Sequence, residues 1–179
     1  MALRTVEQYL ESLRDGRRVY VQGERVADVT THPIMQINVQ HSANVYDYAQ
    51  RPGLADLFTM PSPDTREPVS RYFMQPKSPE EVALRGRLIE EHTRQDNSTL
   101  NLTKVVGTDA LMALTVTAAH LDRDLGTSYQ ARVRDYLSHC RENDLSLALA
   151  QTDAKGDRSL RPHEQADPDL YVRIVDRRN

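Results

Sequence analysis

The side chains that could do chemistry gather in one loop near the C-terminal end of the chain. A short apolar run at residues 145–150 leads into a polar segment that carries Asp153, Lys155, Gly156, Asp157 and Arg158. A loop of this composition after a strand can bind a ligand through its charges and its backbone N–H groups. Loops are also normally polar because they lie in solvent. The residues alone therefore leave two interpretations open, a ligand-binding loop and a solvated turn.

The histidines and the cysteine do not form a second reactive cluster. Six histidines are scattered along the sequence with no pair at the spacing of metal ligands: His32, His41, His92, His120, His139 and His163. The single cysteine, Cys140, excludes an internal disulfide and a cysteine-based metal site, and it fits a reducing cytoplasm. Cys140 also lies on an apolar helical stripe, where a cysteine is usually a small core residue. No metal site is predicted.

The overall composition is that of a globular protein with a modest core. Of the 179 residues, 39% are hydrophobic and 27% are charged, and the mean hydropathy is −0.64. The net charge of −3 combines interspersed charges of both signs, which argues against nucleic acid as a partner. No apolar run approaches the roughly 20 residues that span a bilayer, and the first residues lack the apolar core of a signal peptide. We therefore expect a cytoplasmic protein with no membrane partner.

A helix and a hairpin are predicted at the start of the chain. Thr5 and Gln8 form a capping-box pattern, so a short helix should follow Thr5 and end near residues 15–16. Two β-prone segments then flank Gly23, which predicts a small β-hairpin at residues 17–27. A second helix should begin with Pro33 at its first position and end at residues 51–53. One side of this helix carries Ile34, Ile37, His41, Val45 and Tyr48, and His41 is interpreted there as a core or interface residue.

Residues 59–79 contain five of the nine prolines, a density that excludes a long helix or a central strand. Large apolar side chains in this segment indicate an ordered loop over the core: Val69, Tyr72, Phe73 and Met74. The next helix should run from the N-cap Ser78 to about Gln95, with Leu84, Leu88 and Ile89 facing inward. Gly86 in its interior suggests that a neighbouring element approaches closely there.

Two further helices and two strands complete the predicted elements. The segment 110–119 is apolar on nearly all sides, which predicts burial between other helices. The last helix opens at residues 126–128 and carries one apolar stripe, made of Tyr129, Val133, Tyr136, Leu137 and Cys140. Residues 145–150 and 170–175 are predicted strands. Because two strands do not make a stable sheet, we expect a helical domain at 1–143 and the incomplete beginning of a β domain at 144–179.

Several segments, in this order, resemble the superfamily of 4-hydroxyphenylacetate 3-monooxygenase (HpaB-like) and 4-hydroxybutyryl-CoA dehydratase. They are residues 4–13, 18–26, 28–33, 141–145, 152–159 and 165–172. The resemblance implies a mainly α fold like the N-terminal helical domain of the acyl-CoA dehydrogenases, followed by the first strands of a middle β domain. It also implies that the remaining domains of the flavin site are supplied by further chain or by a partner.

The resemblance implies FAD as the cofactor, reduced by a separate reductase. The segment of residues 149–158 would approach the flavin, with contacts from Leu149, Gln151, Thr152, Lys155 and Arg158. Thr152 would face the isoalloxazine ring, since groups of this kind orient a flavin and tune it. Lys155 and Arg158 would be loop charges, and ion pairing with the neighbouring aspartates Asp153 and Asp157 is the alternative.

The sequence departs from both branches of the family in the expected substrate pocket, formed by Val106, Asp109 and Ala110. Phenol hydroxylases of the family carry an Arg, a Tyr and a His that hold a phenolate, and these positions correspond to Val106, Ala110 and Leu149. The dehydratases ligate an iron–sulfur cluster through cysteines that correspond to residues near Asn101 and Val105. The run 106–110 looks more like the dehydratase branch, yet neither substrate chemistry transfers intact.

Three hypotheses follow for the function. The first is an oxygenase of the HpaB type, which uses reduced FAD and O2 to hydroxylate a small aromatic or related substrate. The second is a redox-neutral flavin enzyme that acts on an acyl-CoA, such as a dehydratase or isomerase. The third is a non-catalytic helical module that contributes assembly contacts. The resemblance also implies a homo-oligomer.

Overall fold

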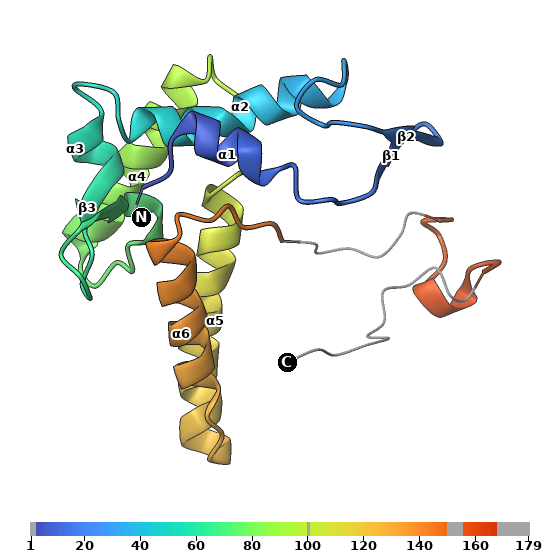
Figure 1. Cartoon of the computed structure of the whole chain (residues 1–179). Coiled ribbons are helices and arrows are strands. Elements are labelled where there is room, and N and C mark those ends of the chain that lie inside the picture. Colours follow the sequence, from blue (N-terminus) through green and yellow to red (C-terminus); the bar gives the residue numbers. More distant parts are fainter. Residues whose placement is uncertain (1–2, 100, 150–155, 168–179) are drawn as a thin grey trace. The chain divides into compact units, whose positions relative to one another are not determined.

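The computed structural model describes residues 3–99, 101–149 and 156–167 and is mainly helical with two small antiparallel sheets (Figure 1). The chain separates into two compact units, residues 1–148 and residues 149–179. The elements of the first unit are α1 (Val6–Ser12), β1 (Val19–Val21), β2 (Glu24–Val26), α2 (Met35–Tyr48), α3 (Ala55–Phe58), β3 (Thr59–Pro61), β4 (Pro68–Ser70), the 3-10 helix η1 (Arg71–Phe73), α4 (Pro79–Gln95), α5 (Val105–Leu125) and α6 (Tyr129–Glu142). In the second unit, the short 3-10 helix η2 spans Pro162–Glu164. Within the described residues, no helix is long and apolar enough to cross a membrane.

The capping signals at the start of the chain are confirmed. Thr5 Oγ1 accepts a hydrogen bond from the backbone N–H of Gln8 at 3.2 Å, and the Gln8 side chain accepts one from the Thr5 N–H at 2.9 Å. The predicted hairpin is also present, because β1 and β2 pair antiparallel with Val19 opposite Val26. Its turn needs the glycine, since Gly23 has a φ of 85°, in the left-handed region that favours glycine.

The second helix differs from its prediction in its start and in its buried side. Helix α2 begins at Met35, so Pro33 precedes it instead of occupying its first position. Ile34 and Ile37 are 49% and 67% exposed, whereas Val39 and Ala43 are buried. The expected stripe is therefore wrong at Ile34 and Ile37. The packing partners of α2 lie on the side that carries Val39 and Ala43. The stripe is confirmed at Val45 and Tyr48, which are both buried.

The core is rich in aromatic rings that join α1, α2, η1 and α4. Tyr9 and Tyr46 stack with ring centroids 4.6 Å apart. Leu88 of α4 is fully buried in the same cluster. The proline-rich segment lies over this core as an ordered loop, and the predicted burial of its apolar side chains is confirmed for Val69, Tyr72, Phe73 and Met74. It also forms a short hairpin of β3 and β4 that the sequence pattern did not indicate.

Helix α4 confirms both of its predicted ends, but one expectation about its interior is wrong. Ser78 Oγ accepts a hydrogen bond from the Glu81 N–H at 3.3 Å, and the helix ends at Gln95. The expected close neighbour at Gly86 is absent, because a Cβ placed there would meet no described heavy atom within 4 Å. Gly86 therefore lies on an open side of the helix.

Helices α5 and α6 lie side by side and are joined by a short turn at Gly126, which has a φ of 66° (Figure 1). The expected burial of α5 on all sides is wrong. Leu114 and Val116 are 54% and 59% exposed, because among the described elements only α6 and η1 make extensive contacts with this helix. The stripe of α6 is confirmed at Leu137 and Cys140, which are buried.

The remaining stripe residues and the predicted strands differ from expectation. Tyr129 and Tyr136 of α6 are 44% and 52% exposed. Residues 145–149 form no strand, and the described part of that prediction is wrong. Residues 145–148 instead lie along the start of α5, where the Leu147 N–H donates to the Thr103 carbonyl at 3.2 Å. The second predicted strand, at 170–175, lies outside the described residues.

Candidate functional site

The start of α5 and the segment that leaves α6 are joined by a buried ion pair. Lys104, the N-cap residue of α5, lies with its Nζ 2.5 Å from Asp144 Oδ1, and both side chains are 1% exposed. Burial lowers the pKa of Lys104, and the adjacent Asp144 carboxylate counteracts that shift. The other carboxylate oxygen of Asp144 accepts from the Arg4 N–H at 3.1 Å. The pair is therefore fully enclosed and fixes the two segments against each other.

A glycine permits the two segments to lie in direct contact. A Cβ built on Gly107 would lie 2.7 Å from the carbonyl carbon of Leu147 and nearer still to its Cβ and carbonyl oxygen. Gly107 is therefore required because any side chain would overlap Leu147, not because of its backbone angles. Gly107 is the third residue of α5, and its contact with Leu147 was not predicted from the sequence.

The three predicted pocket residues share one side of α5. Val106, Asp109 and Ala110 are three and four residues apart, which places them on the same face of a helix. Val106 is 37% exposed and Ala110 is half-buried. The Asp109 side chain is 53% exposed. This face therefore offers an apolar surface next to one accessible carboxylate.

A buried arginine that sequence reasoning missed holds Asp109 in place. Arg85 of α4 donates from Nε to Asp109 Oδ1 at 3.0 Å, from Nη2 to Thr108 Oγ1 at 3.0 Å and from Nη1 to the Tyr72 carbonyl at 2.8 Å. Its side chain is only 9% exposed. One signal was available: Arg85 lies three residues before Leu88 on the buried side of α4, where an arginine needs partners.

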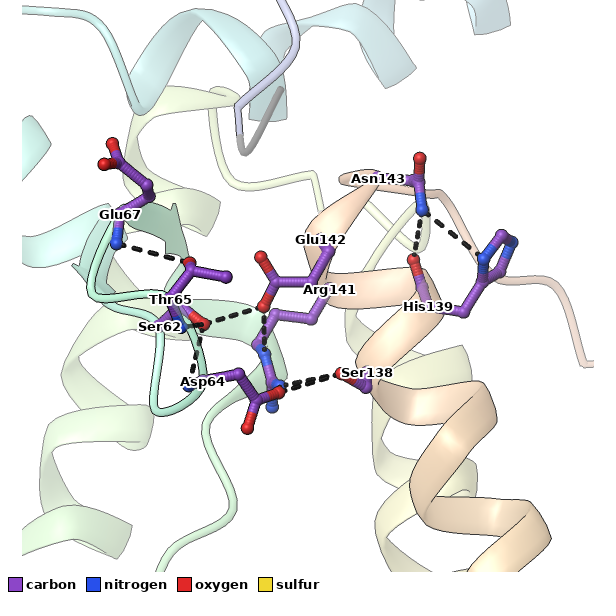
Figure 2. A network of polar contacts seen from close by, with 9 residues as sticks. All are labelled: Ser62, Asp64, Thr65, Glu67, Ser138, His139, Arg141, Glu142 and Asn143. Atoms are coloured by element: carbon purple, nitrogen blue, oxygen red, sulfur yellow. Dashed lines mark hydrogen bonds and ion pairs between the residues drawn. The ribbon is translucent and has the colours of Figure 1, made fainter.

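A second arginine network holds the end of α6 against the β3–β4 hairpin (Figure 2). Arg141 pairs with Asp64, and its Nε lies 3.1 Å from Glu142 Oε1. Ser62 donates to the same Glu142 oxygen at 2.7 Å, and Ser138 donates to Asp64 at 2.9 Å. The network fixes the last turn of α6 just before Asp144 enters its buried pair.

A third polar cluster lies in the core between α2, η1 and α4. His92 bonds Tyr72 through Nδ1 and lies 3.0 Å from Asp96 Oδ2 through Nε2. Asp96 also accepts from Tyr48 and from Asn44, the latter at 2.7 Å. Burial lowers the pKa of His92 although Asp96 opposes the shift. The cluster is enclosed, and its effect on the site is to hold α4 and η1, which carry Arg85 and its carbonyl partner.

His41 lies at the edge of this core cluster. Its Nε2 lies 3.1 Å from Asp96 Oδ2 without hydrogen-bond geometry. Its carbonyl accepts from Asn101 at 2.6 Å. Asn101 and Val105, the residues near the expected cysteine positions, are both buried. Within the part of the chain that the structure describes, no group of three or more metal-ligating side chains comes together.

The expected flavin contacts fall in the second unit. Leu149 is 50% exposed and Arg158 is exposed. Gln151, Thr152 and Lys155 lie outside the described residues. Asp157 accepts from the N–H and the hydroxyl of Ser159 at 2.9 and 2.6 Å. These five contacts remain predictions.

A comparison with protein families matches residues 5–179 to the N-terminal region of 4-hydroxyphenylacetate 3-hydroxylase. The chain belongs to this family. The family, with its HpaB-like and dehydratase branches, is the one that the segments of the sequence indicate.

Proteins from both branches of the family are similar to this chain. The 4-hydroxybutyryl-CoA dehydratase/vinylacetyl-CoA-Delta-isomerase of Clostridium aminobutyricum is 36% identical over 177 residues, which cover 98% of this chain and 36% of the relative. An oxygen-tolerant 4-hydroxybutyryl-CoA dehydratase from N. maritimus matches the structure with a TM-score of 0.83 and 33% identity over 98% of this chain and 35% of that one. The oxygenase component HpaB of 4-hydroxyphenylacetate 3-monooxygenase, in complex with FAD and 4-hydroxyphenylacetate, matches with a TM-score of 0.82 and 25% identity, over 98% of this chain and 36% of that one. The chain thus spans about a third of the length of these relatives.

The exposed face at the start of α5 has the chemistry that a flavin or an aromatic substrate needs. Val106 and Ala110 supply apolar surface for a ring, and Asp109 supplies an acceptor for an N–H or O–H group at the edge of that ring. These three residues supply apolar surface and one accessible acceptor, groups that would suit one wall of a ring-binding site.

Proposed function

We propose that this chain is the helical part of a flavin-dependent oxygenase of the HpaB type, which uses reduced FAD and O2 to hydroxylate a small aromatic or related substrate. The observation that carries the proposal is the family match over residues 5–179. The similarity to an oxygenase component in complex with FAD, over 98% of this chain, supports FAD as the cofactor. A separate flavin reductase would deliver the reduced cofactor.

In this proposal each part of the site has a distinct task. Val106 and Ala110 exclude water from one side of the bound ring, and Asp109 accepts a hydrogen bond from the ligand. The loop residues Leu149, Gln151, Thr152, Lys155 and Arg158 contact the flavin. Bound reduced FAD would supply the electrons and the O2 chemistry, while the protein orients the substrate and keeps water away.

The rest of the assembly follows from the same family. We propose an acyl-CoA dehydrogenase-like fold for the complete protein, with the remaining domains or a partner chain closing the flavin site. The protein would be cytoplasmic and homo-oligomeric. The division into a helical domain at 1–143 and a β domain that begins at 144–179 belongs to this proposal.

A redox-neutral flavin enzyme that acts on an acyl-CoA is the second candidate. It is favoured by sequence identity, which is 33% to the solved structure of a dehydratase and 25% to that of HpaB. Val106 and Ala110 also have no side-chain donor for a phenolate. Against the dehydratase reaction itself, Asn101 and Val105 provide no thiolate for an iron–sulfur cluster.

The test uses the full-length protein that contains this chain. FAD is titrated first, and binding is expected for both candidates. Product analysis then compares a panel of phenols, supplied with NADH and a flavin reductase, with a panel of CoA thioesters supplied without reductant. Hydroxylated phenols support the oxygenase, whereas isomerised or dehydrated thioesters support the second candidate. Absence of FAD binding in the full-length protein would refute both.

A further inference from the structure

The structure contains two arginine–aspartate pairs with nearly equal burial. The side chains of Arg85 and Asp109 are 9% and 53% exposed. Those of Arg141 and Asp64 are 8% and 56% exposed. In each pair a buried guanidinium holds a carboxylate that remains half in solvent. Both carboxylates are held through one oxygen, and the two pairs differ in what lies beside the carboxylate.

The carboxylate of Asp64 is bound through one oxygen, Oδ2, by Arg141 and Ser138, in the network that also includes Ser62 and Glu142 (Figure 2). The carboxylate of Asp109 has only Arg85 as a partner within the described residues. Both of its hydrogen bonds go to Oδ1. Oδ2 of Asp109 is left as an oriented acceptor beside the exposed Val106 and the half-buried Ala110.

Arg85 is itself immobilised by three separate anchors. Besides Asp109, it donates to the hydroxyl of Thr108 and to the carbonyl of Tyr72. An arginine held in this way presents its planar fork in a fixed direction. The orientation of Asp109 is therefore set by α4 and η1 and does not have to be organised when a ligand binds, which lowers the entropic cost of binding.

We propose that Asp109 is the specificity-determining residue of this site and that Arg85 is its positioning residue. Asp109 accepts a hydrogen bond from a neutral hydroxyl group of the substrate and repels an anionic group at the same place. The site would thus take the neutral, hydroxyl-bearing form of a small substrate. The inference rests on the proposed flavin enzyme and adds the charge state of its substrate.

Replacing Asp109 by asparagine gives a directional test, because the two ends of an amide differ. The donors of Arg85 claim the amide oxygen in Asp109→Asn, so the amide N–H2 occupies the place of Oδ2. The variant then offers a donor where the native protein offers an acceptor. A neutral hydroxyl ligand exchanges its hydrogen bond to a charged carboxylate for a weaker one from the amide N–H2, while an anionic ligand gains a donor and escapes the repulsion.

The experiment measures binding of phenol and of benzoate, a neutral and an anionic ring of similar size, to the full-length FAD-bound protein. Calorimetry or the perturbation of the flavin spectrum gives both dissociation constants. The native protein should prefer phenol, and Asp109→Asn should weaken phenol binding about tenfold, the difference between a hydrogen bond to a charged group and one between neutral groups. The same variant should strengthen benzoate binding, so that the preference shifts toward the anion.

The matched control is Asp64→Asn, which neutralises the other pair at nearly the same burial. It should leave the ratio of the two dissociation constants unchanged, even where it lowers stability. Arg85→Lys, which keeps the charge without the fixed fork, should reduce the preference for phenol without reversing it. This second variant also tests the inference if Asp109→Asn fails to fold.

The outcomes separate this inference from the proposed function. An unchanged ratio in Asp109→Asn, with FAD bound, would overturn the role of Asp109 and leave the flavin enzyme standing. An equal change in Asp64→Asn would overturn it as well, since the effect would then be structural. Failure of the native protein to bind FAD would overturn the proposed function and this inference with it.

Discussion

The contact between Gly107 and Leu147 yields the sharpest stability prediction. Gly107→Ala adds a methyl group where the carbonyl carbon of Leu147 lies 2.7 Å away and two further Leu147 atoms lie nearer. These atoms belong to the backbone and Cβ, so they cannot move aside as the end of a flexible side chain would. Either α5 shifts, or the segment 145–148 lifts away from it.

The magnitude follows from opposing terms. Alanine gains up to about 1 kcal/mol over glycine in a helix interior. Overpacking costs about 1–3 kcal/mol. If the segment lifts, the hydrogen bond from Leu147 to Thr103 is lost as well, which costs about 0.5–1.5 kcal/mol. When both costs apply, they exceed the helix gain, and we expect a net destabilisation of about 0.5–3.5 kcal/mol.

The matched control is Gly86→Ala in α4, where the added methyl group meets nothing within 4 Å. This variant has the same change in helix propensity without the overlap, so it should stabilise the protein by up to about 1 kcal/mol. Urea unfolding followed by circular dichroism would report both midpoints. A Gly107→Ala variant as stable as Gly86→Ala would refute the argument from the close contact.

Three further predictions concern buried groups. Lys104→Met leaves Asp144 buried without its partner and should lower the free energy of unfolding by about 3–5 kcal/mol, whereas Arg94→Met, at an exposed pair, should change the urea midpoint little. Burial lowers the pKa of His92 below the ordinary 6.5. The unfolded chain therefore takes up the proton first, and the free energy of unfolding falls as the pH drops below about 6.5. His92→Gln should reduce the change of the urea midpoint between pH 7.5 and pH 5, and an unchanged pH dependence would contradict this. Burial raises the pKa of the Cys140 thiol, so Ellman's reagent should react with it far more slowly in the native protein than in urea, and equal rates would contradict its burial.

Local signals predicted the elements whose information lies in a few neighbouring residues. The Thr5 capping box, the Gly23 hairpin and the Ser78 cap were all recognised, because each depends on contacts within about four residues. The expected side of α2 was wrong at Ile34 and Ile37, which are exposed. Spacing shows that a helix has an apolar stripe, but the packing partners decide which residues the stripe includes.

The polar anchors of the site were harder to predict because each joins residues far apart in the sequence. Arg85 meets Asp109 across 24 positions, and Lys104 meets Asp144 across 40. Nothing in the local pattern of one partner identifies the other. The same reason explains the expected strand at residues 145–150: an apolar run is compatible with a strand, and only the contact with Gly107 shows that this run packs along a helix instead.

The frame of the site and its ligand chemistry depend on different residues. Lys104, Gly107 and Asp144 fix the start of α5 against the segment that leaves α6, through burial and close contact that tolerate little change. Val106 is exposed and Ala110 is half-buried, whereas the side chains of the Lys104–Asp144 pair are fully buried. Under the proposed function, substitution at these two positions should change which ligand binds without disturbing the fold. Such a separation would let a chain match the family model over residues 5–179 while carrying different side chains on this face.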